Sequence, residues 1–188
     1  MKIKLGLFQD EISIPDGYSK LDKKIVKQSG EKGDWLFKPT ENSINCISFF
    51  EQSKKDAMNF DNKQELIDGI HSIMSDKQGL ICVTNGTTNN GHKFIYSIIK
   101  TIEDPIIGAC YFLRMNIQYD KKIYELKGEF TEQGTTGVRD AIISQMLMNE
   151  NIITLEDGKL KGWFKDPYDD SYKKGILMNL SEEEKYDQ

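Results

Sequence analysis

The feature that most constrains this chain is an alternating pattern of apolar and polar residues over positions 108–131, followed directly by a helical pattern. Every second residue from Ala109 to Ile117 is apolar, which places these side chains on one face of a strand. The alternation resumes from Ile123 to Thr131 after a short turn. Together with the apolar run His92–Ile102, these segments predict three successive antiparallel strands.

Two helices are predicted beside this sheet. Residues 62–76 begin with Asn62 and Glu65, the ends of a capping box, and continue with apolar residues at helical spacing. Residues 136–149 predict a second helix. We expect it to lie on the sheet through a small set of residues: Val138, Ala141, Ile142 and Met146. The fold class expected is α+β, with a mainly antiparallel sheet flanked by two or three helices.

The remaining chain predicts further strands and a C-terminal segment. Strand patterns occur at 2–8, 11–14, 35–38, 43–50 and 80–84, and the loop 85–92 predicts a hairpin turn. Residues 1–158 are therefore interpreted as the α+β domain. Residues 159–188 are polar but rich in large apolar groups. We expect this segment to pack back on the domain and to end in an acidic, solvated stretch at 181–188.

Charge and composition narrow the possible partners. The formal net charge is −5 and the lysines and arginines form no stripe, so general nucleic-acid binding is not expected. No apolar run approaches the ~20 residues that span a bilayer. Cys46, Cys82 and Cys110 are odd in number and lie in apolar runs. They are interpreted as reduced, buried thiols, and a cytoplasmic location is expected.

The junction between the last strand and the second helix, Phe130–Asp140, is the best candidate binding site. Gly134 and Gly137 allow a sharp turn, and Thr135 or Thr136 can cap the helix through its hydroxyl group. A well-formed turn from strand to helix explains these residues. The alternative is an anion bound at the free N–H groups of the first helical turn. Its ligand candidates are Thr135, Thr136, Gly137 and Arg139.

Arg139 is the unexplained residue of this junction. A carboxylate such as Asp140 is favoured at the positive end of the helix dipole, whereas a cation opposes it. The partner of Arg139 is left open between Glu129, Glu132, another segment and a ligand. The junction lacks the Lys-Ser/Thr pair of a phosphate loop and the third glycine of a dinucleotide-binding motif.

Other candidate chemistry is weak. The chain has two histidines, His71 and His92, and no Cys-x-x-Cys or His-x-x-x-His pattern, so no metal site is predicted. Arg114 shares a strand face with apolar residues and predicts a salt bridge at the edge of the core. The acids from Asp166 to Asp170 are interpreted as a turn rather than a cation site. No cofactor and no enzymatic activity are predicted.

Several of these segments together resemble a known family. The run Ile12–Tyr18, the long meander of strands and the late Gly-x-x-Gly helix resemble the PsbP-like α/β/α sandwich family over about residues 10–150. The tail segments Trp163–Asp169 and Gly175–Ser181 are similar to uncharacterised proteins of low-GC Gram-positive bacteria. The resemblance implies a binding or accessory scaffold without a shared catalytic constellation. Lipid-anchored members of that family carry a leader with a lipidated cysteine, which is not expected for this chain.

Two functions are weighed. The first is a cytoplasmic binding or accessory protein that contacts another protein, in the manner of an immunity protein that neutralises its partner. The second is an enzyme or small-anion receptor that uses Arg139, the helix N-terminus and the loop 85–92, which must then line one pocket. The sequence leaves the oligomeric state open.

Overall fold

A computed structural model provides the structure of the chain. It describes residues 2–5, 10–22, 24, 34–40, 43–102, 108–119, 121–132 and 137–186. Of the four candidate ligand residues, Gly137 and Arg139 are described, while Thr135 and Thr136 lie outside these ranges. The structure therefore bears on half of the predicted anion site.

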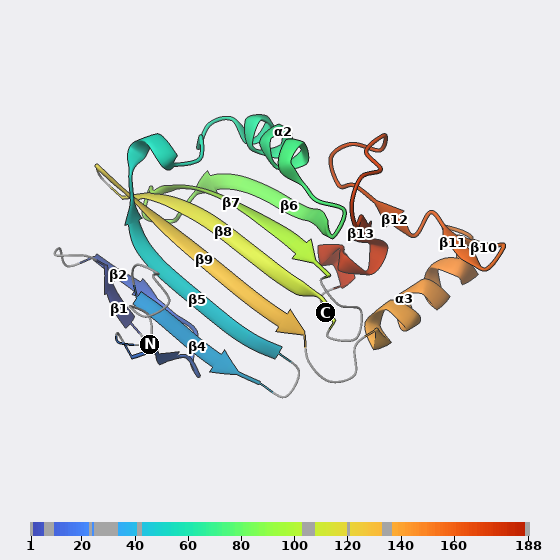
Figure 1. Cartoon of the computed structure of the whole chain (residues 1–188), viewed down its shortest axis with the longest axis horizontal. Helices are drawn as coiled ribbons and strands as arrows, with labels where there is room; N and C mark the ends of the chain where they lie inside the picture. The colour runs from blue at the N-terminus through green and yellow to red at the C-terminus, as the bar shows by residue number, and fades with distance from the viewer. Residues whose placement is uncertain are drawn as a thin grey trace.

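The centre of the molecule is a seven-stranded antiparallel sheet in the order β3-β4-β5-β9-β8-β7-β6 (Figure 1). Its strands are β3 (Ser19–Lys20), β4 (Asp34–Pro39), β5 (Ser43–Gln52), β6 (Gln78–Thr87), β7 (Lys93–Thr101), β8 (Cys110–Tyr119) and β9 (Lys122–Glu132). The three successive strands expected from the sequence are β7, β8 and β9. The α+β class with a mainly antiparallel sheet is confirmed.

Register confirms which side chains share a face. Tyr111 lies opposite Phe130, and Met115 lies opposite Leu126, so the apolar sets of β8 and β9 point the same way. The hairpin before them differs from the prediction. Because β6 extends to Thr87 and β7 begins at Lys93, its connecting turn is shorter than the loop 85–92.

Short elements surround the sheet. They are the hairpin of β1 (Lys2–Leu5) and β2 (Asp10–Ser13), the hairpin of β10 (Thr154–Glu156) and β11 (Lys159–Lys161), the pair β12 (Phe164–Lys165) and β13 (Met178–Asn179), and the 3-10 turns η1 (Lys54–Asp56), η2 (Leu180–Glu182) and η3 (Glu184–Tyr186). The elements from β10 onward lie with α3 at one end of the molecule (Figure 1). This end is where the candidate site is built.

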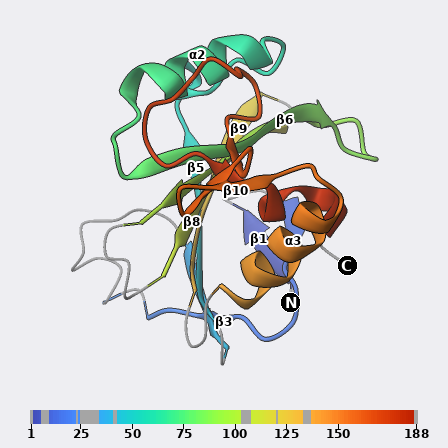
Figure 2. The same cartoon turned by 90° about the vertical axis from the view of Figure 1, so that its right-hand side faces the viewer.

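Helix α2 (Lys63–Ile73) matches the first predicted helix. The Asn62 side chain accepts a hydrogen bond from the Glu65 amide at 3.2 Å, so the predicted N-cap is confirmed. The helix ends earlier than position 76 because Met74 is already extended. Ile67 and Ile70 are buried against β6, and α2 lies over that strand in both views (Figure 2).

Helix α3 (Val138–Asn149) forms where predicted but buries a different face. Ile143 and Leu147 pack with Ile153 and Trp163, whereas Val138, Ile142 and Met146 are exposed. The predicted orientation against the sheet is wrong. The physical reason is that α3 carries two apolar stripes one residue apart. The C-terminal segment that begins at residue 159, called the tail from here on, supplies Trp163, which covers one stripe. The other stripe is left in solvent.

The C-terminal segment returns to the sheet after α3. The Ile176 amide donates to the Gln78 carbonyl oxygen at 2.8 Å, at the start of the edge strand β6. Gly79 permits this approach because a Cβ atom there would lie 1.5 Å from the Ile176 carbonyl oxygen. The fold-back brings residues of the tail beside α2, β6 and β8.

Candidate functional site

The N-terminus of α3 is the first part of the candidate site. Gly137 occupies the N-cap position with a φ of 85°, a left-handed conformation that glycine adopts without strain. The N-cap position predicted for a threonine is therefore taken by glycine. Asp140 in the first turn accepts hydrogen bonds from Asn179 Nδ2 at 3.0 Å and from the Ser181 hydroxyl group. These bonds join α3 to the tail.

A polar hollow of about 280 Å³ opens beside this helix end, and we call it the α3 pocket. Gly137 and Arg139, both predicted as ligand residues, line it. The other charged and polar side chains of its wall are Lys100, Tyr111, Glu132, Asp140, Asn179, Ser181 and Glu182. Of these, Glu132 and Asp140 belong to the predicted junction, and the other five were not predicted. No residue of the loop 85–92 lines this wall. The loop comes just before β7, whereas Lys100 of the wall lies near the other end of that strand. The expectation that this loop lines the same pocket is wrong.

Lys100 is the most buried cation of the pocket, with 4% of the residue exposed. Its Nζ lies 3.0 Å from Glu182 Oε1, and the Tyr111 hydroxyl group donates to the same oxygen at 2.7 Å. The second oxygen, Glu182 Oε2, accepts a hydrogen bond from the backbone N–H group of Asn179 at 2.7 Å. Burial, and then the Glu182 carboxylate, raise the pKa of Tyr111 far above its ordinary value of 10.0.

These contacts determine what the α3 pocket can do. Lys100 and Arg139 bring two positive charges to the wall, while Glu132, Asp140 and Glu182 bring three carboxylates. Glu182 and Asp140 already accept hydrogen bonds from the protein. The network therefore holds the tail against α3 and β8. Among the described residues of the wall there is neither a histidine nor a thiol that would titrate near neutral pH.

The outer side of α3 forms a second and different hollow. An open groove of about 670 Å³ runs between α3 and the C-terminal turn η3, and we call it the α3 groove. Its apolar wall is the exposed stripe Val138, Ile142 and Met146, at 54%, 58% and 46% exposure. Its charged residues are Arg139 and Lys185. Arg139 thus lies between the polar pocket and the apolar groove.

A small ion-pair cluster adjoins the groove. Lys165 bonds to Glu183 Oε1, and Lys185 Nζ lies 2.6 Å from Glu183 Oε2. Burial acts to raise the pKa of Glu183, but the two lysines lower it below its ordinary value. Because two lysines share one carboxylate, the cluster keeps a positive charge in a chain that is acidic overall.

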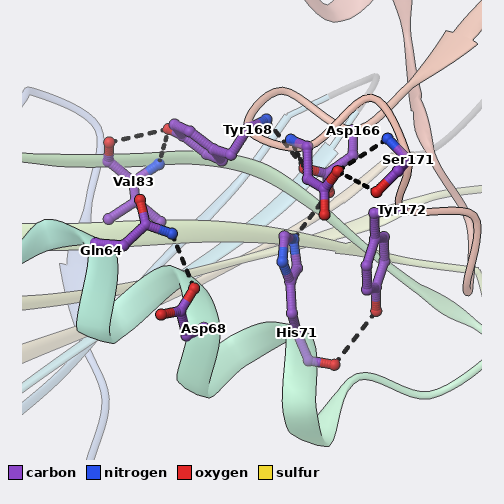
Figure 3. A network of polar contacts seen from close by, with 9 residues as sticks. Gln64, Asp68, His71, Val83, Asp166, Tyr168, Ser171 and Tyr172 are labelled. Carbon is purple, nitrogen blue, oxygen red and sulfur yellow. Dashed lines mark hydrogen bonds and ion pairs between the residues drawn. The ribbon is translucent and has the colours of Figure 1, made fainter.

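A second polar network joins α2 to the tail, away from α3 (Figure 3). His71 Nε2 lies 2.9 Å from Asp166 Oδ2, and the His71 ring stacks on Tyr172 with ring centroids 4.1 Å apart. Asp166 Oδ1 accepts from the amides of Tyr168 and Asp169. The expected turn at Asp166–Asp170 is confirmed, and its first carboxylate also holds His71.

Tyr168 closes part of the edge of the sheet in the same network (Figure 3). Its hydroxyl group accepts from the Val83 amide and donates to the Val83 carbonyl oxygen at 3.0 Å. Both groups belong to the edge strand β6, where unpaired backbone groups favour pairing with another chain. His71, Asp166 and Tyr168 therefore have structural partners, and the network fixes the tail to α2 and β6.

The remaining residues singled out from the sequence lie mainly on the sheet. Arg114 Nε lies 2.7 Å from Glu125 Oε1, which confirms the predicted salt bridge. Cys46, Cys82 and Cys110 form no disulfide among the described residues, but they are only partly buried, so the prediction of buried thiols is wrong. Burial raises the pKa of the Cys46 and Cys110 thiols, and the Glu129 carboxylate adds to this effect. Such thiols are poor nucleophiles.

Two further observations concern metals and membranes. Within the described ranges, no three histidine, cysteine, aspartate or glutamate side chains are grouped so as to hold a metal ion. No helix in the described part of the chain is both long and apolar enough to cross a membrane.

Comparison with known proteins adds no family. No family model matches this chain, and no curated protein matches its sequence. The fold defines the class of protein as α+β with a large antiparallel sheet. Beyond that class, the candidate function rests on the chain's own surfaces.

Proposed function

We propose that this protein is a binding or accessory protein that contacts another protein through the α3 end of the molecule. The observation that carries the proposal is the distribution of exposed apolar side chains. Of the eight large apolar side chains exposed in the described residues, six lie between Val138 and Phe164. Apolar surface gathered in one region typically marks an interaction site.

An immunity-type role is the form of partner binding we favour. Such a protein neutralises its partner by surface complementarity, so it needs a folded scaffold and a contact surface rather than a catalytic group. The buried networks at Glu182 and Asp166 provide a rigid scaffold, because each ties the tail to distant elements. A cytoplasmic location and the PsbP-like kinship belong to this proposal.

The test is recovery of a partner by affinity purification from the cells that produce the protein. Ile142→Lys places a charge in the apolar stripe, and Ile73→Lys is the matched control because Ile73 is 80% exposed on α2. We expect the wild type and Ile73→Lys to recover the same stoichiometric partner, and Ile142→Lys to lose it. A partner retained by Ile142→Lys, or none recovered by the wild type, would count against the proposal.

A second candidate function is a receptor for a small anion in the α3 pocket. It is supported by Lys100, which is buried at the wall of this pocket with Glu182 as its ion-pair partner in the described residues. The three carboxylates of the same wall oppose an anion, and this ranks the candidate second. Titration calorimetry with phosphate and with acetate tests it. Saturable binding lost in Arg139→Gln supports it, and heats of dilution alone exclude both anions.

A further inference from the structure

The α3 groove has properties that specify the kind of segment it accepts. Val138, Ile142 and Met146 follow one another at four-residue spacing. Side chains at this spacing form a ridge along an α-helix, and ridges of this kind pack into the corresponding grooves of a second helix. The groove lies between this ridge and residues Lys185 and Tyr186 of η3. A helix is therefore the secondary structure that complements this surface.

The charges of the groove specify the partner further. Arg139 and Lys185 are its charged wall residues, and no carboxylate lines it in the described part of the chain. Lys185 is 61% exposed at its side chain and shares Glu183 with Lys165. A partner segment with acidic side chains beside its apolar stripe is thus attracted, whereas a basic one is repelled.

The exposed area argues against a second copy of the chain as the occupant. Three side chains at about half exposure leave on the order of 300 Å² of apolar surface, below the ~800 Å² per partner of a standard stable interface. A self-complementary contact would also bring the cations of two copies near each other. A helix from a different protein can add contacts with Tyr186 and with the polar surroundings.

We propose that the α3 groove binds an amphipathic helix of a partner protein, with apolar residues at four-residue spacing and acidic residues beside them. This inference rests on the proposed partner-binding function and names the chemistry of the contact. Ile142 lies at the centre of the site, and Arg139 and Lys185 select for the acidic side chains.

The experiment is a selection from a displayed library of amphipathic helical peptides, each roughly 16 residues long so that a helix can form. The apolar face and the flanking charged positions are randomised. The full-length protein, Ile142→Lys and Lys185→Glu are the baits, with Ile73→Lys as the control. Ile142 and Lys185 are exposed, so these variants are expected to fold, and circular dichroism melts check this.

We expect peptides enriched on the wild type to carry an excess of aspartate and glutamate. They should bind Ile142→Lys at least tenfold more weakly, Ile73→Lys equally well, and Lys185→Glu more weakly. Enrichment of basic peptides, equal binding to Ile142→Lys, or no enrichment at all overturns the inference. A dimer of the free protein that Ile142→Lys dissociates also overturns it, because the occupant is then a second copy.

The outcomes separate this inference from the proposed function. If the cellular partner is lost from Ile142→Lys but is unaffected by Lys185→Glu and carries no acidic helix, partner binding stands and the inference fails. If acidic helices are selected but no cellular partner is found, the groove has the inferred specificity and the proposed function fails.

Discussion

His71 of α2 and Asp166 of the C-terminal segment are 95 positions apart in the sequence, yet their side chains meet at 2.9 Å. The Asp166 side chain is only 2% exposed, and its other oxygen accepts two backbone amides at the turn that follows. One carboxylate thus shapes the turn and fastens it to the helix. The tail depends on this group for its position.

Replacing this carboxylate should destabilise the protein. Asp166→Ala removes the acceptor of three hydrogen bonds in a buried place, and we expect the free energy of unfolding to fall by about 2 to 4 kcal/mol. Urea denaturation followed by circular dichroism measures the change. Asp170→Ala is the matched control because Asp170 is exposed, and its effect should stay within about 0.5 kcal/mol. An equal loss of unfolding free energy in the two variants would mean that the Asp166 carboxylate does not hold the turn against α2.

The orientation of α3 gives a second prediction from two adjacent residues. Ile143 is 6% exposed and packs near Trp163, whereas Ile142 is 58% exposed. We expect Ile143→Ala to lower the free energy of unfolding by about 2 to 4 kcal/mol, because it leaves a cavity in the core. Ile142→Ala should cost less than about 0.5 kcal/mol. Chemical denaturation of both variants decides the matter, and the reverse order would mean that α3 lies on its other face.

The sheet was predictable from the sequence, whereas the face of α3 was not. The alternation from Ala109 to Ile117 allows a single assignment of the buried face, since the side-chain period of a strand is two residues and one face must be buried. A helix with apolar residues at both 142 and 143 can bury either of two faces. The choice between them depends on Trp163, whose position is set by tertiary contacts beyond the helix.

Only those residues of the candidate site that lie close together in the sequence were predictable. Glycine before a helix, with Arg139 in the first turn, is a local pattern, and both Gly137 and Arg139 line the α3 pocket. Tyr111 and Glu182 lie 71 positions apart, and no local pattern pairs them. The one signal in the sequence was Lys100, a cation at the end of an apolar strand, which needs a buried partner once the strand is covered.

Two glycines give a third prediction, because one is needed by the fold and the other is not. Gly69 lies inside α2 with no atom within 4 Å of the place a Cβ would take, whereas a Cβ at Gly79 would lie 1.5 Å from the Ile176 carbonyl oxygen. Gly69→Ala should raise the free energy of unfolding by about 0.5 to 1 kcal/mol. Gly79→Ala should lower it by more than about 2 kcal/mol.

Thermal and urea unfolding of the two glycine variants measure these opposite changes. The comparison also tests the position of the tail, since the steric conflict at Gly79 exists only if Ile176 lies against β6. If Gly79→Ala is as stable as the wild type, the tail does not rest there.

The pH dependence of stability supplies a fourth prediction, through Tyr111. Burial and the Glu182 carboxylate raise the pKa of Tyr111 in the folded protein above its ordinary value of 10.0. The stabilisation from the neutral hydroxyl group is therefore complete below about pH 10. It is lost as the pH rises beyond this value, because the unfolded chain then releases a proton that the folded protein retains.

Tyr111→Phe isolates this contribution, since phenylalanine does not ionise. At pH 8 the variant should be less stable by about 1 to 3 kcal/mol, because Glu182 loses a charge-assisted hydrogen bond. By pH 11 the difference between the two proteins should shrink by about 1 kcal/mol, as the stability of the wild type falls by up to ~1.4 kcal/mol per pH unit through this one group. Urea denaturation at both pH values gives the two differences. Other groups that titrate in this range are common to both proteins and cancel, so a difference that stays constant would mean that Tyr111 ionises in the folded protein as it does in the unfolded chain.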